Sequence, residues 1–305
     1  MSARHDRESR HRHLGAEKSW GKVRVSTGGL CPAALTAGDE KDPLRVLLSI
    51  DTKPCYECPH LCSKMPVAMA TFLVLDIETV PDTEVYSPGQ PSPGSERTFP
   101  PIFACKPVVL GVMWLDESFA CKKAGTIGEG KDEAGMLADF AEFVDKWEPT
   151  IVTWNGRGFD LPVLMLRSLR HGISAPWYYR KPGYRYRYST AGHIDLCDIL
   201  ADHGATRMTS LHGAARLIGL PGKDGVDGSQ VEGMYRTGQI EALREYCLSD
   251  VAQTAFLFLR YQLLSGQLDR MTYTRVARDL LETLASDPRL AALVAHVDRG
   301  RLLLE

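Results

Sequence analysis

The sequence predicts an α/β domain in which α-helices flank a mixed central β-sheet. Short apolar runs rich in β-branched residues alternate with longer segments whose apolar residues recur at helical spacing. A chain of 305 residues is long enough for one sizeable domain with appendages. Its composition, 44% hydrophobic and 24% charged, is that of an ordinary globular protein.

The first predicted strand is the buried run 71–80, TFLVLDIETV, around which we expect the sheet to form. A long Pro/Gly/Ser-rich loop follows, and later strands alternate with helices. We expect these strands at 108–115, 117–124, 150–154 and 193–196. We expect helices at 132–147, 160–171, 210–220, 240–264 and 274–304, the last interrupted near the Asp287-Pro288 pair.

Three regions divide the chain. Residues 1–68 show no periodicity and predict a poorly ordered extension, which is either native or an over-extended reading frame with the true start at Met65 or Met69. Residues 69–269 hold the predicted α/β domain, and 270–305 form a helical C-terminal extension.

The N-terminal extension also carries a cysteine cluster, in which Cys55, Cys58 and Cys62 lie near Cys31 and His60. These residues are the types that bind structural zinc. The second half of a zinc knuckle is missing, however, so the spacing favours cysteines without a metal.

Charge and hydropathy exclude several classes of protein. The net charge of −2 argues against a protein that coats nucleic acid through its overall field, although a local basic groove remains compatible with it. No apolar run is long enough to span a membrane, and the polar start is not a signal peptide. We therefore expect a cytoplasmic protein without a membrane partner.

Two carboxylates lie near the end of the first strand. Asp76 and Glu78 are two residues apart, so they leave the same face, roughly 6 to 7 Å apart along the strand. Like charges beside an apolar core are costly unless a cation lies between them, and hard divalent cations prefer carboxylate oxygens. The alternative is that both residues are ordinary polar residues of a strand end.

Two further patterns add acidic groups. Asp160 follows the predicted strand 150–154 after a turn with glycines at 156 and 158, where it either points into a site or offsets the dipole of the next helix. Tyr246 and Asp250 are four residues apart, so they share one face of the helix 240–264. Either both belong to the functional site, or they are an ordinary pair on the protein surface.

Taken together, D-x-E, N-x3-F-D and Y-x3-D in this order resemble the tyrosine-containing branch of the DEDD superfamily of 3'-5' exonucleases. The chain is most similar to predicted exonucleases related to the proofreading domain of family B DNA polymerases. The resemblance covers about 69–269 and implies a ribonuclease H-like fold with two-metal hydrolysis by Mg²⁺ or Mn²⁺.

The resemblance also implies roles for individual residues. The residues that match the four metal ligands are Asp76, Glu78, Asp160 and Asp250. Tyr246 matches the tyrosine that positions the attacking water. Asn155 and Phe159 match the rest of the second motif.

Residues 177–188 interleave aromatic and cationic side chains, a pattern that grips single-stranded nucleic acid by stacking and phosphate contacts. If the segment is extended, its tyrosines and arginines lie on opposite faces; the alternative is a hairpin that packs its tyrosines on the domain. We expect the substrate, most simply the 3' end of single-stranded DNA, to contact Thr79, Asn155, Phe159, Tyr184, Arg185 and Arg187.

Three other polar residues have competing interpretations. His193 and Asp195 either support the metal site or form a satisfied core pair. Lys223 lies in a glycine-rich loop and could contact a phosphate, but the loop lacks the Walker spacing, which favours an ordinary loop residue. Two other functions also remain open: an exoribonuclease of the ribonuclease D type, and a nucleic-acid-binding domain without catalysis.

Overall fold

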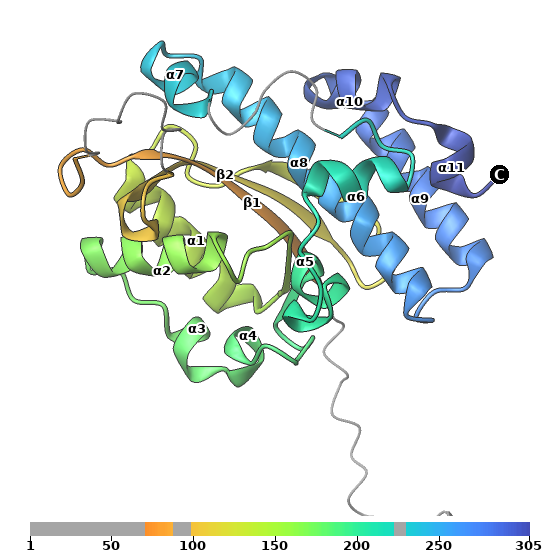
Figure 1. The fold of residues 1–305 in the computed structure, drawn as a ribbon, viewed down its shortest axis with the longest axis horizontal. Coiled ribbons are helices and arrows are strands. Elements are labelled where there is room, and N and C mark those ends of the chain that lie inside the picture. Colours follow the sequence, from red (N-terminus) through yellow and green to blue (C-terminus); the bar gives the residue numbers. More distant parts are fainter. Residues whose placement is uncertain (1–70, 88–98, 223–229) are drawn as a thin grey trace, which may run out of the picture. The chain divides into compact units, whose positions relative to one another are not determined.

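The structure is a computed structural model that describes residues 71–87, 99–222 and 230–305 (Figure 1). The predicted cysteine cluster and Lys223 lie outside the described residues. The strands are β1 (Phe72–Pro81), β2 (Cys105–Leu115), β3 (Cys121–Thr126), β4 (Thr150–Thr153) and β5 (His193–Asp195). The helices are α1 (Glu133–Trp147), α2 (Asp160–His171), α3 (Pro176–Arg180), α4 (Pro182–Arg185), α5 (Leu196–Leu200), α6 (Leu211–Leu217), α7 (Val231–Arg236), α8 (Ile240–Leu264), α9 (Arg270–Ala285), α10 (Ala291–Ala295) and α11 (Arg299–Leu303).

The five strands form one mixed sheet in the order β3-β2-β1-β4-β5. β1 pairs antiparallel with β2 on one side and parallel with β4 on the other, and β5 continues the parallel half. The parallel pairing with β4 ends at Val74, so the second half of β1 extends past β4. The predicted mixed sheet is confirmed, and the edge that β4 leaves open is where the polar residues of β1 lie.

β1 is buried on both faces, as its sequence predicts. Leu73, Leu75 and Ile77 pack on the face that carries α1 and α2. Val74 packs on the opposite face among residues of α8. Because side chains alternate along a strand, Asp76 and Glu78 leave β1 on the α8 face with Val74.

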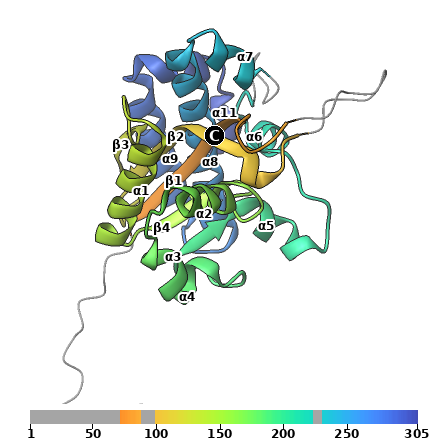
Figure 2. The ribbon, with the colours of Figure 1, turned by 90° about the vertical axis from the view of Figure 1, so that its left-hand side faces the viewer.

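Helices cover the two faces of the sheet. Figures 1 and 2 show α1, α2 and α3 on one side, with α6, α8 and α9 on the other. α8 is buried along most of its 25 residues because it lies between the sheet and the helices α6 and α9. The predicted boundary after residue 269 stays a prediction, although α9 shares a hydrophobic core with α8.

Element boundaries differ from prediction where a local cap or turn decides them. β3 begins at Cys121 and not at 117, because the Asp116 carboxylate accepts hydrogen bonds from the backbone N–H groups of Ser118 and Ala120, both at 2.9 Å, and closes a turn. α9 begins at Arg270 because Asp269 caps it. The short helices α5 and α7 were not predicted.

A buried network of ion pairs holds α2 against α1 and the end of β1. The Arg167 side chain, 1% exposed, lies 2.7 Å from the Asp82 carboxylate and donates to both Glu133 carboxylate oxygens at 2.5 and 2.8 Å. Asp82 follows β1 and Glu133 begins α1, so three segments meet at one guanidinium. Such paired, hydrogen-bonded charges hold a specific geometry and are costly to break singly.

The α/β fold class is therefore confirmed. Among the described residues, no helix is both long enough and apolar enough to cross a membrane.

Candidate active site

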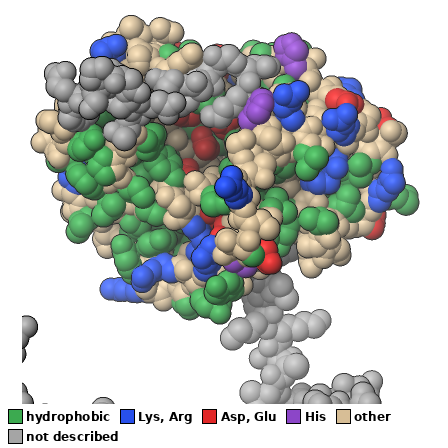
Figure 3. Space-filling model, in the orientation of Figure 1, with side chains coloured by type: hydrophobic (Ala, Val, Ile, Leu, Met, Phe, Trp, Pro, Cys, Tyr) green, Lys and Arg blue, Asp and Glu red, His purple; other side chains and the backbone are tan. Residues whose placement is uncertain are grey.

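Asp76 and Glu78 leave β1 on the face that α8 covers. Figure 3 shows acidic side chains in a hollow of the surface. The region of Asp76, Glu78, Asp160 and Asp250 is called the acidic hollow below. Glu78 is 7% exposed and Asp76 is partly buried. Burial raises the pKa of Asp76 well above its ordinary value, and the charges of Asp160, Glu78 and Asp250 raise it further. The negative charges of all three other predicted carboxylates therefore act on the Asp76 carboxyl.

Asp160 reaches this place from the end of β4. The chain turns after Thr153 and α2 begins at Asp160, which is 3% exposed. Burial is the largest cause that raises the pKa of Asp160, to about 7, whereas a hydrogen bond from the Ile77 backbone favours its charged form. The Asp160 carboxylate thus occupies the open edge of β1 beyond the last β4 pair.

The turn between β4 and α2 needs its two glycines. A Cβ at Gly156 would lie 2.4 Å from the Thr153 hydroxyl oxygen, and one at Gly158 would lie 2.5 Å from Asn155 Oδ1. Asn155 itself adopts φ +64°, a conformation that asparagine tolerates better than most residues. This compact turn aims Asp160 at β1.

Asp195 holds the same turn from β5. Its carboxylate accepts hydrogen bonds from the backbone N–H groups of Asn155 and Arg157, both at 2.9 Å, and from that of Asp198 at 3.1 Å. His193 bonds to Thr153 at 2.8 Å, and burial lowers its pKa to about 3, so its ring is neutral. Both residues hold neighbouring polar groups in the core.

Tyr246 and Asp250 approach the hollow from α8. Asp250 is 5% exposed and accepts a hydrogen bond from Gln253 Nε2 at 3.3 Å, while Tyr246 packs beside the buried Val80 and Val109. One turn of helix separates the two side chains, as their spacing predicts. The structure therefore brings the four predicted carboxylates together, and Tyr246 lies one turn of α8 before Asp250.

Cys247 is a site neighbour that sequence reasoning missed. Its Sγ lies 3.5 Å from Asp76 Oδ2 and 3.4 Å from the Asp76 carbonyl oxygen. Asp76, Glu78 and Cys247 each offer a ligand atom within 4.8 Å of the others. Burial raises the pKa of the thiol well above its usual value, so a neutral thiol faces Asp76.

Gly111 lets α8 come this close to the sheet. It pairs with Asp76 across β1 and β2, and a Cβ there would lie 2.7 Å from Cys247 Sγ and 3.2 Å from Val251 Cγ2. Any side chain at this position must displace α8 or its residues. Gly111 is a positioning residue that the sequence pattern alone did not reveal.

We expect Gly111→Ala to lower kcat about tenfold or more, because α8 carries Tyr246 and Asp250 and has to move away from Asp76. Adding Cys247→Gly in the same chain removes the 2.7 Å clash and should recover part of the loss. Steady-state kinetics and thermal unfolding of both variants check this. A normal kcat for Gly111→Ala alone would contradict this expectation.

The remaining predicted contacts are neighbours of the carboxylates in the chain. Thr79 follows an irregularity in the β1–β2 register after Glu78. Phe159 precedes Asp160, and its ring meets the exposed Phe99 edge-on with centroids 5.6 Å apart. Both aromatic rings therefore lie beside the second motif.

The segment 177–188 is not extended, so the condition under which its tyrosines and arginines would lie on opposite faces is not met. Pro176 and Pro182 each begin a short helix, α3 and α4. Tyr184 is 3% exposed, and its hydroxyl donates to the Pro149 carbonyl at 2.8 Å. It packs in the core, which corrects its placement as a substrate contact.

The two arginines of this segment have different surroundings. Arg185 is exposed and lies over the Tyr179 ring, 5.2 Å from its centroid. Arg187 donates to both carboxylate oxygens of Asp198, at 2.5 to 3.2 Å. The Arg157 guanidinium, which sequence reasoning also missed, holds the segment through three carbonyl groups, those of Tyr184, Arg185 and Tyr186, and also donates to the carbonyl of His193 on β5.

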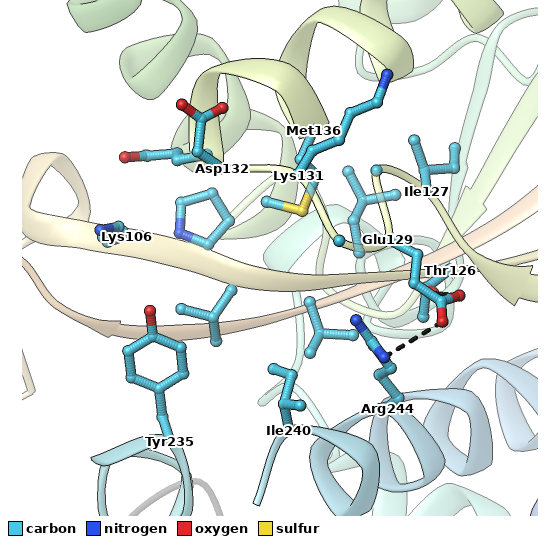
Figure 4. A pocket seen from close by; sticks show the side chains of 17 residues that line it. Lys106, Thr126, Ile127, Glu129, Lys131, Asp132, Met136, Tyr235, Ile240 and Arg244 are labelled. Carbon is cyan, nitrogen blue, oxygen red and sulfur yellow. Dashed lines mark hydrogen bonds and ion pairs between the residues drawn. The ribbon is translucent and has the colours of Figure 1, made fainter. Parts of the chain in front are cut away.

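A cavity of about 370 Å³ lies elsewhere, between β2, the turn before α1, and the start of α8 (Figure 4). None of the five predicted site residues lines it. Its Arg244 pairs with Glu129 at 3.3 Å and with Glu241 at 2.5 Å. The cavity has mixed, internally paired charge and is separate from the acidic hollow.

The fold and the acidic hollow define a nuclease-like α/β domain, and comparison with known proteins agrees. Residues 97–297 match the family described as predicted 3'-5' exonuclease related to the exonuclease domain of PolB. The chain belongs to this family, which confirms the resemblance drawn from the three motifs and the ribonuclease H-like fold that it implies. The match includes Asp160, Tyr246 and Asp250, while Asp76 and Glu78 precede it.

Individual relatives are more distant. The chain is 25% identical over 135 residues to the catalytic subunit of DNA polymerase epsilon from Schizosaccharomyces pombe, a match that covers 43% of this chain and 6% of that protein. The family B DNA polymerase of Pyrobaculum calidifontis matches at 21% identity with a TM-score of 0.45, over 71% of this chain and 29% of its own. Escherichia coli exonuclease I in complex with a dT13 oligonucleotide matches at 16% identity and a TM-score of 0.32, over 73% and 46%.

Proposed function

We propose that this protein is a divalent-metal-dependent 3'-5' exonuclease that hydrolyses the terminal phosphodiester bond of single-stranded DNA. The observation that carries the proposal is the convergence of Asp76 and Glu78 of β1 with Asp160 of α2 and Asp250 of α8, where the other three charges raise the pKa of Asp76. Membership of a predicted exonuclease family supports the reaction class.

The donor set fits Mg²⁺ or Mn²⁺. Burial raises the pKa of Asp76 and of Asp160, and the charges of Asp160, Glu78 and Asp250 raise the pKa of Asp76 further. Ionising these carboxylates is therefore costly in the free protein, and a hard divalent cation removes that cost by binding their oxygens. Asp76, Glu78, Asp160 and Asp250 would hold it, and we propose two ions. When bound, such ions activate a water and stabilise the leaving 3'-oxygen.

Tyr246 is proposed to orient the attacking water by a hydrogen bond. The ordinary pKa of a phenol, about 10, makes tyrosine a poor base at neutral pH. Tyr246→Phe should therefore lower kcat only about tenfold to a hundredfold, the value of one hydrogen bond to a charged partner. Tyr235→Phe on α7, whose tyrosine is exposed, is the matched control for single-turnover kinetics. Equal activity of Tyr246→Phe and wild type would remove this role.

The nucleotide at the 3' end is proposed to contact Thr79, which follows Glu78 in β1, and Asn155 and Phe159, which precede Asp160 in the chain. Bases stack on aromatic rings with little regard for sequence. The edge-on pair of Phe99 and Phe159 offers such a surface beside the second motif.

Arg185 is the proposed phosphate contact of the segment 177–188, because it is exposed while the Arg187 guanidinium is held by Asp198. Arg185→Ala should weaken binding of single-stranded DNA. The slope of log affinity against log salt should fall by about 0.7, the value for one phosphate contact on a single strand. Fluorescence anisotropy over a salt series measures it, and an unchanged slope would exclude this contact.

A digestion of 5'-labelled single-stranded DNA with and without EDTA tests the proposed function. Shortening of the labelled strand one nucleotide at a time, and only with Mg²⁺ or Mn²⁺ present, is the expected result. Release of the labelled nucleotide first, or digestion in EDTA, would overturn it. A matched RNA strand in the same assay identifies an exoribonuclease if it is cut preferentially.

A further inference from the structure

A second hollow, with a volume of about 490 Å³, lies between α6 and the C-terminal helices. Four basic side chains and one acidic side chain contribute to its lining: His212, Arg216, His296, Arg301 and Asp298. Figure 3 shows cationic and histidine side chains over α6 and beyond it, on the same face as the acidic hollow.

The backbone of this second hollow is tightly packed. Gly219 has φ +96°, and a Cβ there would lie 2.8 Å from the Asp298 carbonyl oxygen. The Asp298 N–H donates to the Gly219 carbonyl at 2.8 Å. The loop after α6 and the start of α11 are thereby held together, so the basic side chains project from a fixed backbone.

The charges of the second hollow are only partly compensated within the protein. Arg301 Nε lies 3.6 Å from Asp298 Oδ2, and both side chains are more than half exposed, so this pair is weak. The exposed Arg216 guanidinium has no ion-pair or hydrogen-bond partner among residues 71–87, 99–222 and 230–305. An unpaired guanidinium in a basic hollow is suited to phosphate oxygens.

α6 connects the two hollows. Its N-cap is Ser210. The carbonyl of the preceding Thr209 accepts a hydrogen bond from Trp154 Nε1 at 3.2 Å, and Trp154 directly precedes the second motif. His212 and Arg216 are four residues apart, so they share one face of α6 and lead from this contact toward the second hollow.

We propose that the second hollow binds backbone phosphates of the nucleic-acid strand, several nucleotides away from the 3' end being cut. This inference rests on the proposed function. A strand whose end enters the acidic hollow is repelled there by the carboxylates unless metal is bound, so a basic surface beside it supplies attraction that does not depend on metal. Contacts to phosphates without base contacts also make binding independent of sequence.

The test compares the double variant Arg216→Ala/Arg301→Ala with the control Arg275→Ala/Arg278→Ala, which removes two exposed arginines of α9. Each protein is assayed on dT20 and on dT3, because on this proposal a strand of three nucleotides ends before the second hollow. We expect the ratio of kcat/KM for dT20 to that for dT3 to fall about tenfold in the first variant and to stay at the wild-type value in the control. The salt slope of dT20 binding should fall by about 1.4, which is two contacts of about 0.7 each.

Binding of fluorescent dT20 in EDTA separates this inference from the proposed function. Weaker binding by Arg216→Ala/Arg301→Ala, with no digestion by wild type under any condition, would support the surface and reject the nuclease. Wild-type digestion with an unchanged length ratio and an unchanged salt slope in the variant would overturn the surface alone. An equal effect of the Arg275→Ala/Arg278→Ala control would show that the loss comes from the overall charge of the protein and not from the second hollow. That result would also overturn the proposed phosphate-binding surface.

Discussion

Asp76→Asn is expected to lower kcat by about 1,000-fold or more, which corresponds to roughly 4 kcal/mol of transition-state stabilisation. Asp76 is central to the acidic hollow because the charges of Asp160, Glu78 and Asp250 all act on it. The amide removes a negative charge and one oxygen donor for the metal. Single-turnover digestion of labelled DNA in Mn²⁺ measures the loss.

The same substitution should leave the fold intact and raise the melting temperature in EDTA. The neutral amide no longer repels three carboxylates, and its oxygen can still accept a hydrogen bond from Cys247. Asp139→Asn, which alters an exposed carboxylate paired with Lys131, is the control and should change neither activity nor stability appreciably. Full activity of Asp76→Asn would discard the site assignment, and a lower melting temperature in EDTA would show that repulsion is not what the metal relieves.

Asp160→Asn is expected to alter the pH dependence of stability in the absence of metal. The pKa of Asp160 is raised to about 7 in the folded protein, above the ordinary value of 3.8. The folded state therefore binds more protons than the unfolded state between these values, and the contribution of Asp160 to stability falls as pH rises through this window. The Asp160→Asn variant lacks that contribution because its amide does not titrate.

Melting temperatures in EDTA from pH 4 to pH 8 test this expectation. Wild type and Asp160→Asn should differ least near pH 4, and the variant should melt higher by several degrees near pH 8, since about 1 kcal/mol shifts the melting temperature by 2–4 °C for a domain of this size. The difference between the two proteins isolates Asp160 from His193, whose lowered pKa, about 3, acts in the opposite direction below pH 6.5. Parallel curves would contradict the raised pKa of the buried Asp160, and Mn²⁺ should raise the melting temperature of the wild type more than that of the variant.

The central strand and its carboxylates could be predicted because the evidence is local. An apolar run buried on both faces identifies β1, and alternation along it places Asp76 and Glu78 on one face. Helical spacing similarly places Tyr246 and Asp250 one turn apart on α8. The order of the three motifs along the chain then predicted that β1, α2 and α8, which are distant in sequence, contribute to one site.

Long-range packing could not be read from the sequence. Gly111 and Cys247 meet only because α8 crosses the β1–β2 pair at Asp76, and the Asp195 hydrogen bonds depend on the neighbouring positions of β4 and β5. The segment 177–188 adopts neither of the two conformations considered for it, because Pro176 and Pro182 suit the first turns of short helices and the tyrosine–arginine alternation does not decide its structure. Burial of Tyr184 followed from that folding.

An anomalous difference map from a crystal soaked in Mn²⁺ tests the central claim most directly. The account predicts manganese density in the acidic hollow, within coordination distance of carboxylate oxygens of Asp76 and of at least two of Glu78, Asp160 and Asp250, and no such density in Asp76→Asn crystals. Manganese bound only at other carboxylates, with the hollow empty at saturating Mn²⁺, would contradict it.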